Sequence, residues 1–221
     1  MTSMLPKASS WARCLARWLL AAAGAMAQEL RLPFAGRWFV AHAGDTINGN
    51  HHMAVRAQWY GVDFAKASGE LGRALSRPRP TRVQDFFCWD APVLSPAQGQ
   101  VAAVVGDLPD QPLGKKDVQR PSGNHVVVAT QQGRYVVVAH LRQGSVRVGK
   151  GDRVEAGQPL GRCGNSGNSD YPHVHVHVQD SLDADAIGQN PVFHGLDVEL
   201  TGKTFSNVNW PLIRGLFVTS R

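Results

Sequence analysis

The sequence predicts a single all-β domain built from antiparallel strands, and three observations support this prediction. Short valine-rich runs recur along the chain, separated by segments rich in glycine, proline and asparagine, as in sheets made of hairpins. No run longer than about 12 residues combines helical periodicity with capping residues. Of the 221 residues, the 194 that follow a predicted leader of 27 are enough for one domain with a substantial core.

The predicted strands follow one another closely. Alternation at residues 28–40 predicts the first strand, and residues 58–64 are predicted to form a strand with Asp63 near its end. Residues 106–123 form a long loop with three prolines, and loops of this length often border a binding site. Later strands are predicted at 92–94, 99–105, 124–129, 134–141, 145–148, 159–162 and 173–178, with further candidates at 196–200 and 216–218.

The first 27 residues have the composition of a secretory signal peptide. Three basic residues precede an apolar run at positions 18–27, which ends in the small-x-small pattern Ala25-Met26-Ala27. The run is too short to span a bilayer, and an uncleaved anchor is the alternative. We therefore predict cleavage after Ala27 and a periplasmic or secreted protein. Cleavage would lower the formal net charge from +6 to +3, and no cluster of basic residues indicates nucleic-acid binding.

Two cysteines, Cys88 and Cys163, follow the leader. In an oxidising compartment they permit a disulfide that closes a long loop, whereas two buried free thiols are the alternative. Neither belongs to a Cys-x-x-Cys pair, which disfavours a structural zinc site with cysteine ligands and thioredoxin-like chemistry.

The most informative segment is a Gly/Asn/Ser turn followed by a strand in which histidine alternates with valine. His173, His175 and His177 are predicted to lie on one face, because successive side chains on a strand point to opposite sides. Neighbours on that face are about 6–7 Å apart, so one imidazole can bind a metal while the next contacts what the metal has bound. A solvated polar strand face is the alternative.

Two other places supply polar groups for such a site. His51 and His52 follow Asn50, and His52 lies eleven residues before Asp63, within reach if the intervening loop folds back. His140 ends a valine-rich strand, where a hydrogen bond would ordinarily explain an isolated buried histidine. A catalytic zinc ion takes three protein ligands and keeps one position open for water. Together the clusters predict a site of this kind.

Five segments of the chain resemble the lysostaphin/LytM-type peptidoglycan zinc metalloendopeptidases. They are the aspartate strand at residues 58–64, the Pro-Val…Gly…Val hairpin at 91–101, the strand pair at 123–128 and 135–141, and the turn at 148–161 that precedes the Gly-Asn-Ser-Gly loop and the His-x-His strand. The resemblance spans most of the chain after the leader. It implies the duplicated hybrid-motif β-fold of that family, with long loops around the site.

The resemblance implies that Asp63 and His175 are ligands of one Zn2+ ion, together with a histidine before Asp63. In the commonest family pattern that histidine stands four residues before the aspartate, where this chain has Trp59. One branch of the family instead places it after an asparagine, eleven residues upstream of the aspartate. This pattern selects His52, with His51 as the alternative.

The same resemblance implies roles for other side chains. His140 and His173 match the family's two catalytic histidines that are not ligands. Apart from the resemblance, Asn124 is predicted to orient substrate or a catalytic histidine. Where the family often has glutamate or glutamine after the His-x-His pair, this chain has His177, whose role stays open.

The predicted function is an exported zinc-dependent endopeptidase that hydrolyses the peptide cross-links of bacterial peptidoglycan through a metal-activated water. Its partners would be peptidoglycan peptide stems and cross-bridges, with no nucleic acid and no membrane after cleavage, and the protein is predicted to be a monomer. The predicted divisions are a signal peptide at 1–27, a strand and turn region at 28–50, a peptidase domain at 51–185 and its C-terminal extension at 186–221.

Three alternatives belong to other classes. A catalytically silent cell-wall binding or regulatory module of the same fold is the strongest, and Trp59 favours it. A D-Ala-D-Ala dipeptidase or carboxypeptidase would need a glutamate shortly before its last ligand, but none lies between Glu155 and Glu199. A sugar-transport phosphocarrier domain works in the cytosol, which the predicted leader disfavours.

Overall fold

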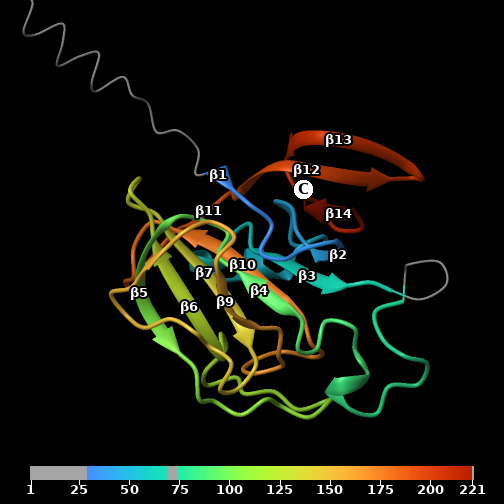
Figure 1. Cartoon of the computed structure of the whole chain (residues 1–221), viewed down its shortest axis with the longest axis horizontal. Coiled ribbons are helices and arrows are strands. Elements are labelled where there is room, and N and C mark those ends of the chain that lie inside the picture. The colour runs from blue at the N-terminus through green and yellow to red at the C-terminus, as the bar shows by residue number, and fades with distance from the viewer. Residues whose placement is uncertain (1–28, 69–73, 221) are drawn as a thin grey trace, which may run out of the picture.

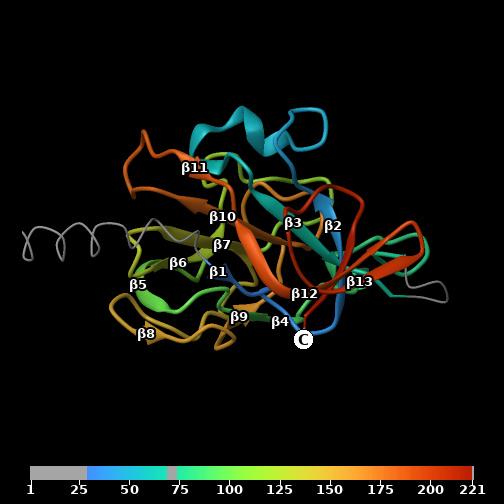
Figure 2. The same cartoon turned by 90° about the horizontal axis from the view of Figure 1, so that it is seen from above.

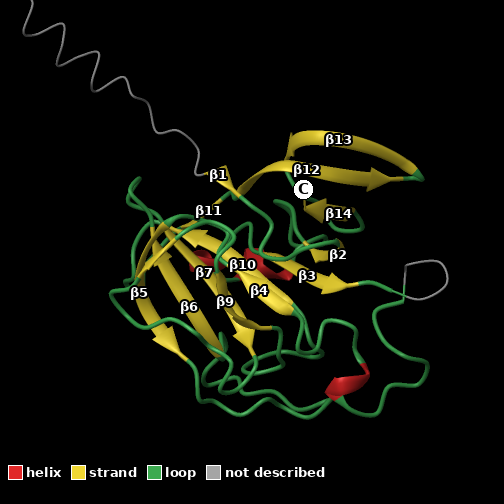
Figure 3. Cartoon of the chain, in the orientation of Figure 1, coloured by secondary structure: helices red, strands yellow, loops and turns green. Residues whose placement is uncertain are grey.

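The computed structural model describes residues 29–68 and 74–220, and within them the chain is built almost entirely from β-strands (Figure 1, Figure 3). The predicted all-β, antiparallel fold class is confirmed. Helices in the described part are three short 3-10 segments, η1 (His51–Ala54), η2 (Arg56–Gln58) and η3 (Val83–Asp85). None has the length or the apolar character needed to cross a membrane. The predicted signal peptide at 1–27 lies outside the described residues.

The strands run from one end of the described chain to the other and are mostly short. In chain order they are β1 (Glu29–Leu30), β2 (Arg37–His42), β3 (Val62–Lys66), β4 (Pro92–Leu94), β5 (Gly99–Val105), β6 (Asn124–Ala129), β7 (Tyr135–Leu141), β8 (Arg153–Val154), β9 (Pro159–Arg162), β10 (Val174–Gln179), β11 (Gly188–Gln189), β12 (Val192–Leu200), β13 (Lys203–Trp210) and β14 (Phe217–Ser220).

One large sheet contains twelve of these strands. Its main path is β1-β12-β14-β2-β3-β10-β7-β6-β5-β8, with β11 paired to β10 and β13 paired to β12. Neighbouring strands are antiparallel, except that β1 runs parallel to β12. At the centre, β10 lies between β3 and β7, although these three strands are far apart in the sequence. The sheet therefore brings distant polar residues onto neighbouring strands.

β4 and β9 form a small second sheet that covers one face of the large one. In Figure 2 these two strands lie below the central strands, whereas the segment that contains η1 and η2 lies above them. The face of the large sheet that is turned away from β4 and β9 carries the polar residues of β3 and β10. Alternate valines of the central strands point into the core between the layers, where they pack with Val93 and Leu160. They are Val126, Val128, Val136, Val138, Val174, Val176 and Val178.

The N-terminal strands are shorter than the sequence predicts. The predicted strand over 28–40 is two strands, β1 and β2, because Pro33 lacks an amide donor and Gly36 adopts a φ of 78°. Likewise β3 begins at Val62 instead of residue 58. Gln58 belongs to η2, and Tyr60 has a φ of 62°.

Two predictions on later strands also differ from the structure. Residues 145–148 are not a strand, because the Ser145 amide turns back to the Arg142 carbonyl. At the C-terminal end, β12 is longer than the predicted 196–200 and pairs with β13, which the pattern does not predict. Most side chains at 203–209 are exposed, so β13 lacks the buried alternation that marks a strand in sequence.

A disulfide joins Cys88 to Cys163, which decides between the two alternatives that the sequence leaves open. The Cα atoms are 5.9 Å apart, and the bond spans a sequence separation of 75 residues. Both cysteines are buried in the main core. The Asp90 amide donates to the Cys163 carbonyl, and the Cys163 amide donates to the Ala91 carbonyl. These contacts hold the chain in place directly before the turn that begins at Gly164.

We expect loss of this disulfide to lower the free energy of unfolding by about 4 kcal/mol, because a cross-link over a loop of this length restricts the unfolded chain. The measurement is urea denaturation of the wild-type protein and of the double variant Cys88→Ala/Cys163→Ala. Reductant added to the double variant is the control and should cause no further loss. An unchanged unfolding midpoint in the double variant would contradict the role assigned to the bond.

Candidate metal centre

β3 and β10 place Asp63 and His175 side by side. The two residues are direct partners in the antiparallel pair, although 112 positions separate them in the sequence. Asp63 Oδ1 lies 2.9 Å from His175 Nδ1, and both side chains are buried. The valine and phenylalanine residues next to them point into the main core, so Asp63 and His175 share the opposite face.

Asn50 brings His52 to the same place. It precedes η1 and accepts a hydrogen bond from the His52 amide at 3.2 Å. Its Nδ2 donates to the carbonyls of Gly44 and Gly61 at 2.9 and 3.0 Å. The side chain is fully buried and ties η1 to the residue directly before β3. As a result, His52 Nε2 lies 2.9 Å from Asp63 Oδ2.

His52, Asp63 and His175 form a buried group whose potential ligand atoms all lie within 4.8 Å of one another. A second group, His42, His51 and Asp63, meets the same criterion, but it uses the same carboxylate and His51 is exposed. Among the described residues, Asp63 lies within ion-pair distance of His52 and His175 but not of His42 or His51. The geometry therefore favours His52 over His51 as the third ligand.

The nitrogen that His52 presents to Asp63 makes no hydrogen bond within the described chain. The other nitrogen, Nδ1, donates to Gln58 Oε1 at 3.3 Å, so in the neutral ring Nε2 carries a lone pair. In the neutral ring this buried lone pair faces Asp63 Oδ2 at only 2.9 Å, an arrangement that a proton or a metal cation between the two atoms relieves. Two imidazole nitrogens and one carboxylate are a donor set of catalytic zinc sites, so the residues present fit this ion.

His140 and His173 face the same group from two further segments. Each donates its Nδ1 hydrogen to a backbone carbonyl, His140 to Ser166 at 2.9 Å and His173 to Tyr171 at 2.8 Å. This leaves Nε2 of each ring for the site, and Nε2 of His173 lies 3.5 Å from Asp63 Oδ1. The two rings are 4.6 Å apart. Both are therefore placed to exchange protons with a molecule bound next to Asp63.

Burial and charge set the protonation of these groups. Burial favours the neutral acid, but the nearby His173 and His52 hold the pKa of Asp63 well below its usual range. Burial lowers the pKa of His140 well below its usual value and that of His175 to about 3, so both rings are neutral at pH 7. Burial also opposes the charged form of His173, but the Asp63 carboxylate outweighs this effect and raises the pKa. One carboxylate among mainly neutral imidazoles provides the electrostatics of a cation site.

His140 reaches the site because β7 is irregular at this residue. Strict alternation would put its side chain in the core with Val136 and Val138. Its φ is 60°, in the left-handed region that residues other than glycine rarely adopt, and Leu141 points into the core instead. Such a conformation costs about 1–3 kcal/mol. The strained backbone therefore turns the imidazole to the polar face.

Asn124 contacts backbone groups in the structure. Its Nδ2 donates to the carbonyls of Leu108 and Leu141 at 2.8 and 3.1 Å, and its Oδ1 accepts from the Leu108 amide at 2.8 Å. The side chain is fully buried. It ties the loop at 106–123 to the end of β7, next to His140, and so supports that histidine only through the backbone.

Gly61 leaves space for two histidine rings of the site. In the sequence, nothing marks this glycine except its position between His52 and Asp63. A Cβ added there would lie 2.9 Å from His175 Cε1 and 3.2 Å from His52 Cγ. The missing side chain therefore makes room for both rings. Such a role depends on contacts between distant segments, which no local pattern contains.

A surface cleft opens onto the candidate ligands. The walls of the cleft come from η1, η2, the loop at 106–123 and the turn after Gly164. A second hollow lies next to the cleft. Gln58 and Ser122 line both, and the second hollow is also lined by His177. None of the residues that line the two is an aspartate, glutamate, lysine or arginine. The residues lining the cleft are His51, His52, Val55, Gln58, Pro121, Ser122, His140, Asn168 and His175.

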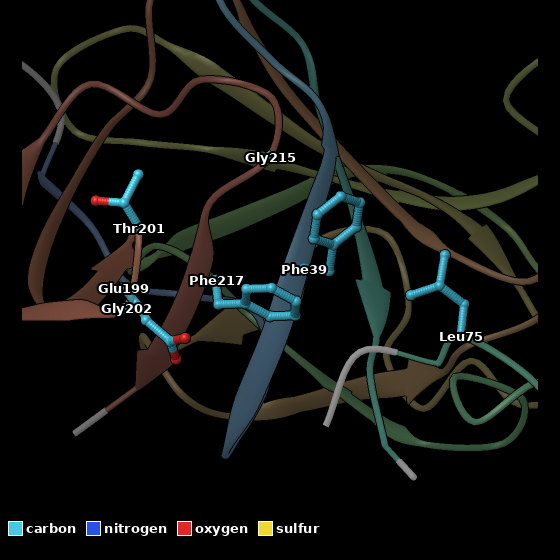
Figure 4. A pocket seen from close by; sticks show the side chains of 7 residues that line it. All are labelled: Phe39, Leu75, Glu199, Thr201, Gly202, Gly215 and Phe217. Carbon is cyan, nitrogen blue, oxygen red and sulfur yellow. The ribbon is translucent and has the colours of Figure 1, made fainter. Parts of the chain in front are cut away.

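A different hollow lies next to β2 and β14 (Figure 4). Phe39 and Phe217 are cross-strand partners there. Arg37 lies 3.8 Å over the Phe217 ring and pairs at 2.8 Å with Glu199, the acidic residue that lines the hollow. This charge is therefore already matched, and no histidine lines the hollow. We assign no catalytic role to it.

The model of peptidase family M23 matches residues 81–189, which include His140, His173 and His175. The chain belongs to the M23 peptidase family. M23 is a family of metallopeptidases. His52 and Asp63 lie outside the matched residues, so their convergence on His175 is an observation separate from the family match. No curated protein matches the chain.

Several solved structures are similar to this chain. Lysostaphin from Staphylococcus simulans is 19% identical over 69% of this chain and 46% of that chain, with a TM-score of 0.43. A variant catalytic domain of the prophage-encoded M23 protein EnpA from Enterococcus faecalis is 21% identical over 76% and 96%, with a TM-score of 0.44. A zinc-containing peptidase from Vibrio cholerae is 19% identical over 72% and 36%, with a TM-score of 0.36. The chain spans less than half the length of the lysostaphin and Vibrio chains.

We expect Gly61→Ala to weaken zinc binding by about 10- to 100-fold, the effect typical of disturbing the groups that orient metal ligands. The added methyl group would displace the rings of His52 and His175. Competition with a zinc-chelating dye measures the affinity. Gly106→Ala is the matched control, because its added methyl group would meet Val146 at an ordinary 3.5 Å. A Gly61→Ala protein that binds zinc as tightly as the control would contradict this reading of the site.

Proposed function

We propose that this M23 peptidase is an exported zinc endopeptidase that cleaves the peptide cross-links of bacterial peptidoglycan. Family membership supports peptide-bond hydrolysis, and the composition of the first 27 residues supports export. The observation that carries the proposal is the buried Nε2 of His52, held against Asp63 without a hydrogen bond. This arrangement supports a cation at a place where two further histidines are available for proton transfer.

His52 Nε2, Asp63 and His175 Nδ1 would hold the zinc ion. When bound, zinc supplies Lewis acidity, which polarises a peptide carbonyl and makes water nucleophilic near neutral pH. The protein contributes the orientation of the donors. Asn50 positions η1, the pairing of β3 with β10 positions Asp63 against His175, and burial keeps bulk water away from all three donors.

His140 and His173 would carry out the proton transfers. The carbonyls of Ser166 and Tyr171 fix the two rings through Nδ1, so each offers Nε2 to the bound substrate. One of these atoms takes the proton of the attacking water, and the pair stabilises the oxyanion and returns a proton to the departing amine. General acid–base catalysis of this kind contributes about 10²–10⁴-fold.

The cleft supports an extended, uncharged peptide as the substrate. It passes the candidate ligands and continues into the adjacent hollow, and no charged aspartate, glutamate, lysine or arginine lines either. Peptide cross-bridges with small side chains match this chemistry. The assignment to peptidoglycan rests on the resemblance to lysostaphin-type enzymes together with the predicted export.

A catalytically silent module of the same fold is the second candidate. Trp59 favours it, because this residue stands where the commonest family pattern has a ligand. The position of His52 weakens that argument, since Asn50 delivers an imidazole to Asp63 from further upstream. Zinc content and hydrolysis together distinguish the two candidates.

We expect His175→Ala and Asp63→Ala to lose zinc, because each removes a ligand. His173→Ala should keep one zinc ion per chain but lose about 10²–10⁴-fold in hydrolysis, because only proton transfer is removed. Elemental analysis and release of fragments from cell-wall material measure the two properties. Equal zinc content with undiminished hydrolysis in all three variants would refute the assignment.

We also expect the protein without its leader to release soluble muropeptides from purified cell-wall sacculi. A chelator should abolish the release, and added zinc should restore it, because the nucleophile depends on the metal. Chromatography of the products identifies the bond that is cut. A protein that binds zinc but releases nothing, like its own His173→Ala variant, would support the silent module instead.

A further inference from the structure

Two side chains, His177 and Gln179, continue from His175 along the same face of β10. His175 Nε2 lies 2.8 Å from His177 Nδ1, and His177 Nε2 lies 2.9 Å from Gln179 Oε1. Gln179 Nε2 then donates to the Ser181 carbonyl at 2.5 Å. Both histidine rings are buried, with 3% of their surface exposed. The row therefore links a candidate metal ligand to a backbone group in the following loop.

The last member of the row determines the direction of every hydrogen bond in it. A backbone carbonyl can only accept, so the Gln179 amide nitrogen donates to Ser181 and its Oε1 faces His177. That oxygen can also only accept, so His177 carries its hydrogen on Nε2. A buried imidazole favours its neutral form, which has one hydrogen. His177 Nδ1 must therefore accept from Nε2 of His175, whose Nδ1 is left with a lone pair.

The other tautomer of His175 would block cation binding. With its hydrogen on Nδ1, the ring would donate to Asp63 Oδ1, which is 2.9 Å away. That hydrogen bond would occupy both the nitrogen and the carboxylate oxygen that a cation needs. An ion could then bind only after the bond had broken and the hydrogen had moved to Nε2.

We propose that His177 is a positioning residue that accepts the Nε2 hydrogen of His175 and so keeps Nδ1 of that ring unprotonated toward Asp63. The inference rests on the proposed metal site and gives a role to the histidine that replaces the glutamate or glutamine common at this position. Those two side chains bring an acceptor oxygen of their own. Histidine can substitute for them only because Gln179 takes its Nε2 hydrogen, so His177 and Gln179 act as a pair.

Zinc affinity tests the proposal in two kinds of variant at position 177. One keeps an aromatic ring without a hydrogen-bond acceptor, and the other keeps an acceptor without the ring. His177→Phe keeps a buried ring but removes the acceptor, and we expect its affinity to fall by about 10- to 100-fold. His177→Gln restores an acceptor oxygen and should bind nearly as tightly as the wild-type protein. Gln179→Leu should weaken binding, because His177 loses the group that fixes its tautomer. His194→Phe, the same substitution on β12, is the matched control and should leave the affinity unchanged.

A second readout uses the metal-free protein and does not depend on activity. Imidazole 15N chemical shifts report which nitrogen carries the hydrogen. We expect His175 to be protonated on Nε2 in the wild-type protein and on Nδ1 in His177→Phe. A His177→Phe protein with unchanged zinc affinity and the hydrogen still on Nε2 of His175 would overturn the proposal.

The two measurements also separate this proposal from the proposed function. If the wild-type protein binds no zinc, the proposed function fails, whereas the tautomer of His175 in the metal-free protein still decides the role of His177. If His177→Phe does not fold, the half-buried Gln179→Leu variant tests the same row at its outer end. Unchanged affinity and an unchanged His175 tautomer in Gln179→Leu would then count against the proposal.

Discussion

The Asp63 carboxylate is a buried negative charge, and the rest of this structure is arranged around it. Taking a carboxylate out of water costs several kcal/mol unless opposite charge or hydrogen bonds compensate. Here the neighbours within about 3 Å are imidazole nitrogens from η1 and β10, and at least one of them offers a lone pair. A charge placed in this way is stabilised by positive charge beside it, either a protonated histidine or a metal ion. The same feature suits the site to a metal ion.

Regular β-structure is interrupted at the residues of the candidate site and next to them. β7 reverses its alternation at His140, which has a φ of 60°, and the short 3-10 segment η1 follows Asn50, whose hydrogen bonds place His52 beside Asp63. Gly61 leaves space where any side chain would collide with the rings of His52 and His175. Local rules tend to fail at functional sites because geometry there is selected for chemistry and stabilised by surrounding structure. These departures all lie within or next to the group around Asp63.

The backbone around the site has its own support. The carbonyls of Ser166 and Tyr171, which accept hydrogen bonds from His140 and His173, belong to the turn between β9 and β10. The disulfide at Cys163 anchors the start of that turn, and Asn124 anchors the neighbouring loop to β7. Gly123 and Gly167 approach so closely that a Cβ on either would collide with the other loop. Ring orientation at the site thus depends on how two loops pack.

Local patterns by themselves determined the fold class, most central strands and the face that the histidines of β10 occupy, because alternation and valine content are properties of neighbouring residues. The likeness to a known family added the candidate ligands Asp63 and His175. Only the tertiary structure decided that His52 and not His51 meets Asp63, that Asn124 is engaged by backbone, that the two cysteines pair, and that His177 belongs to a row ending at Ser181. Each of these depends on a distance or a hydrogen bond that forms when the folded chain brings particular atoms together. The order of residues along a strand shows which side chains share a face, but it does not show what lies opposite them.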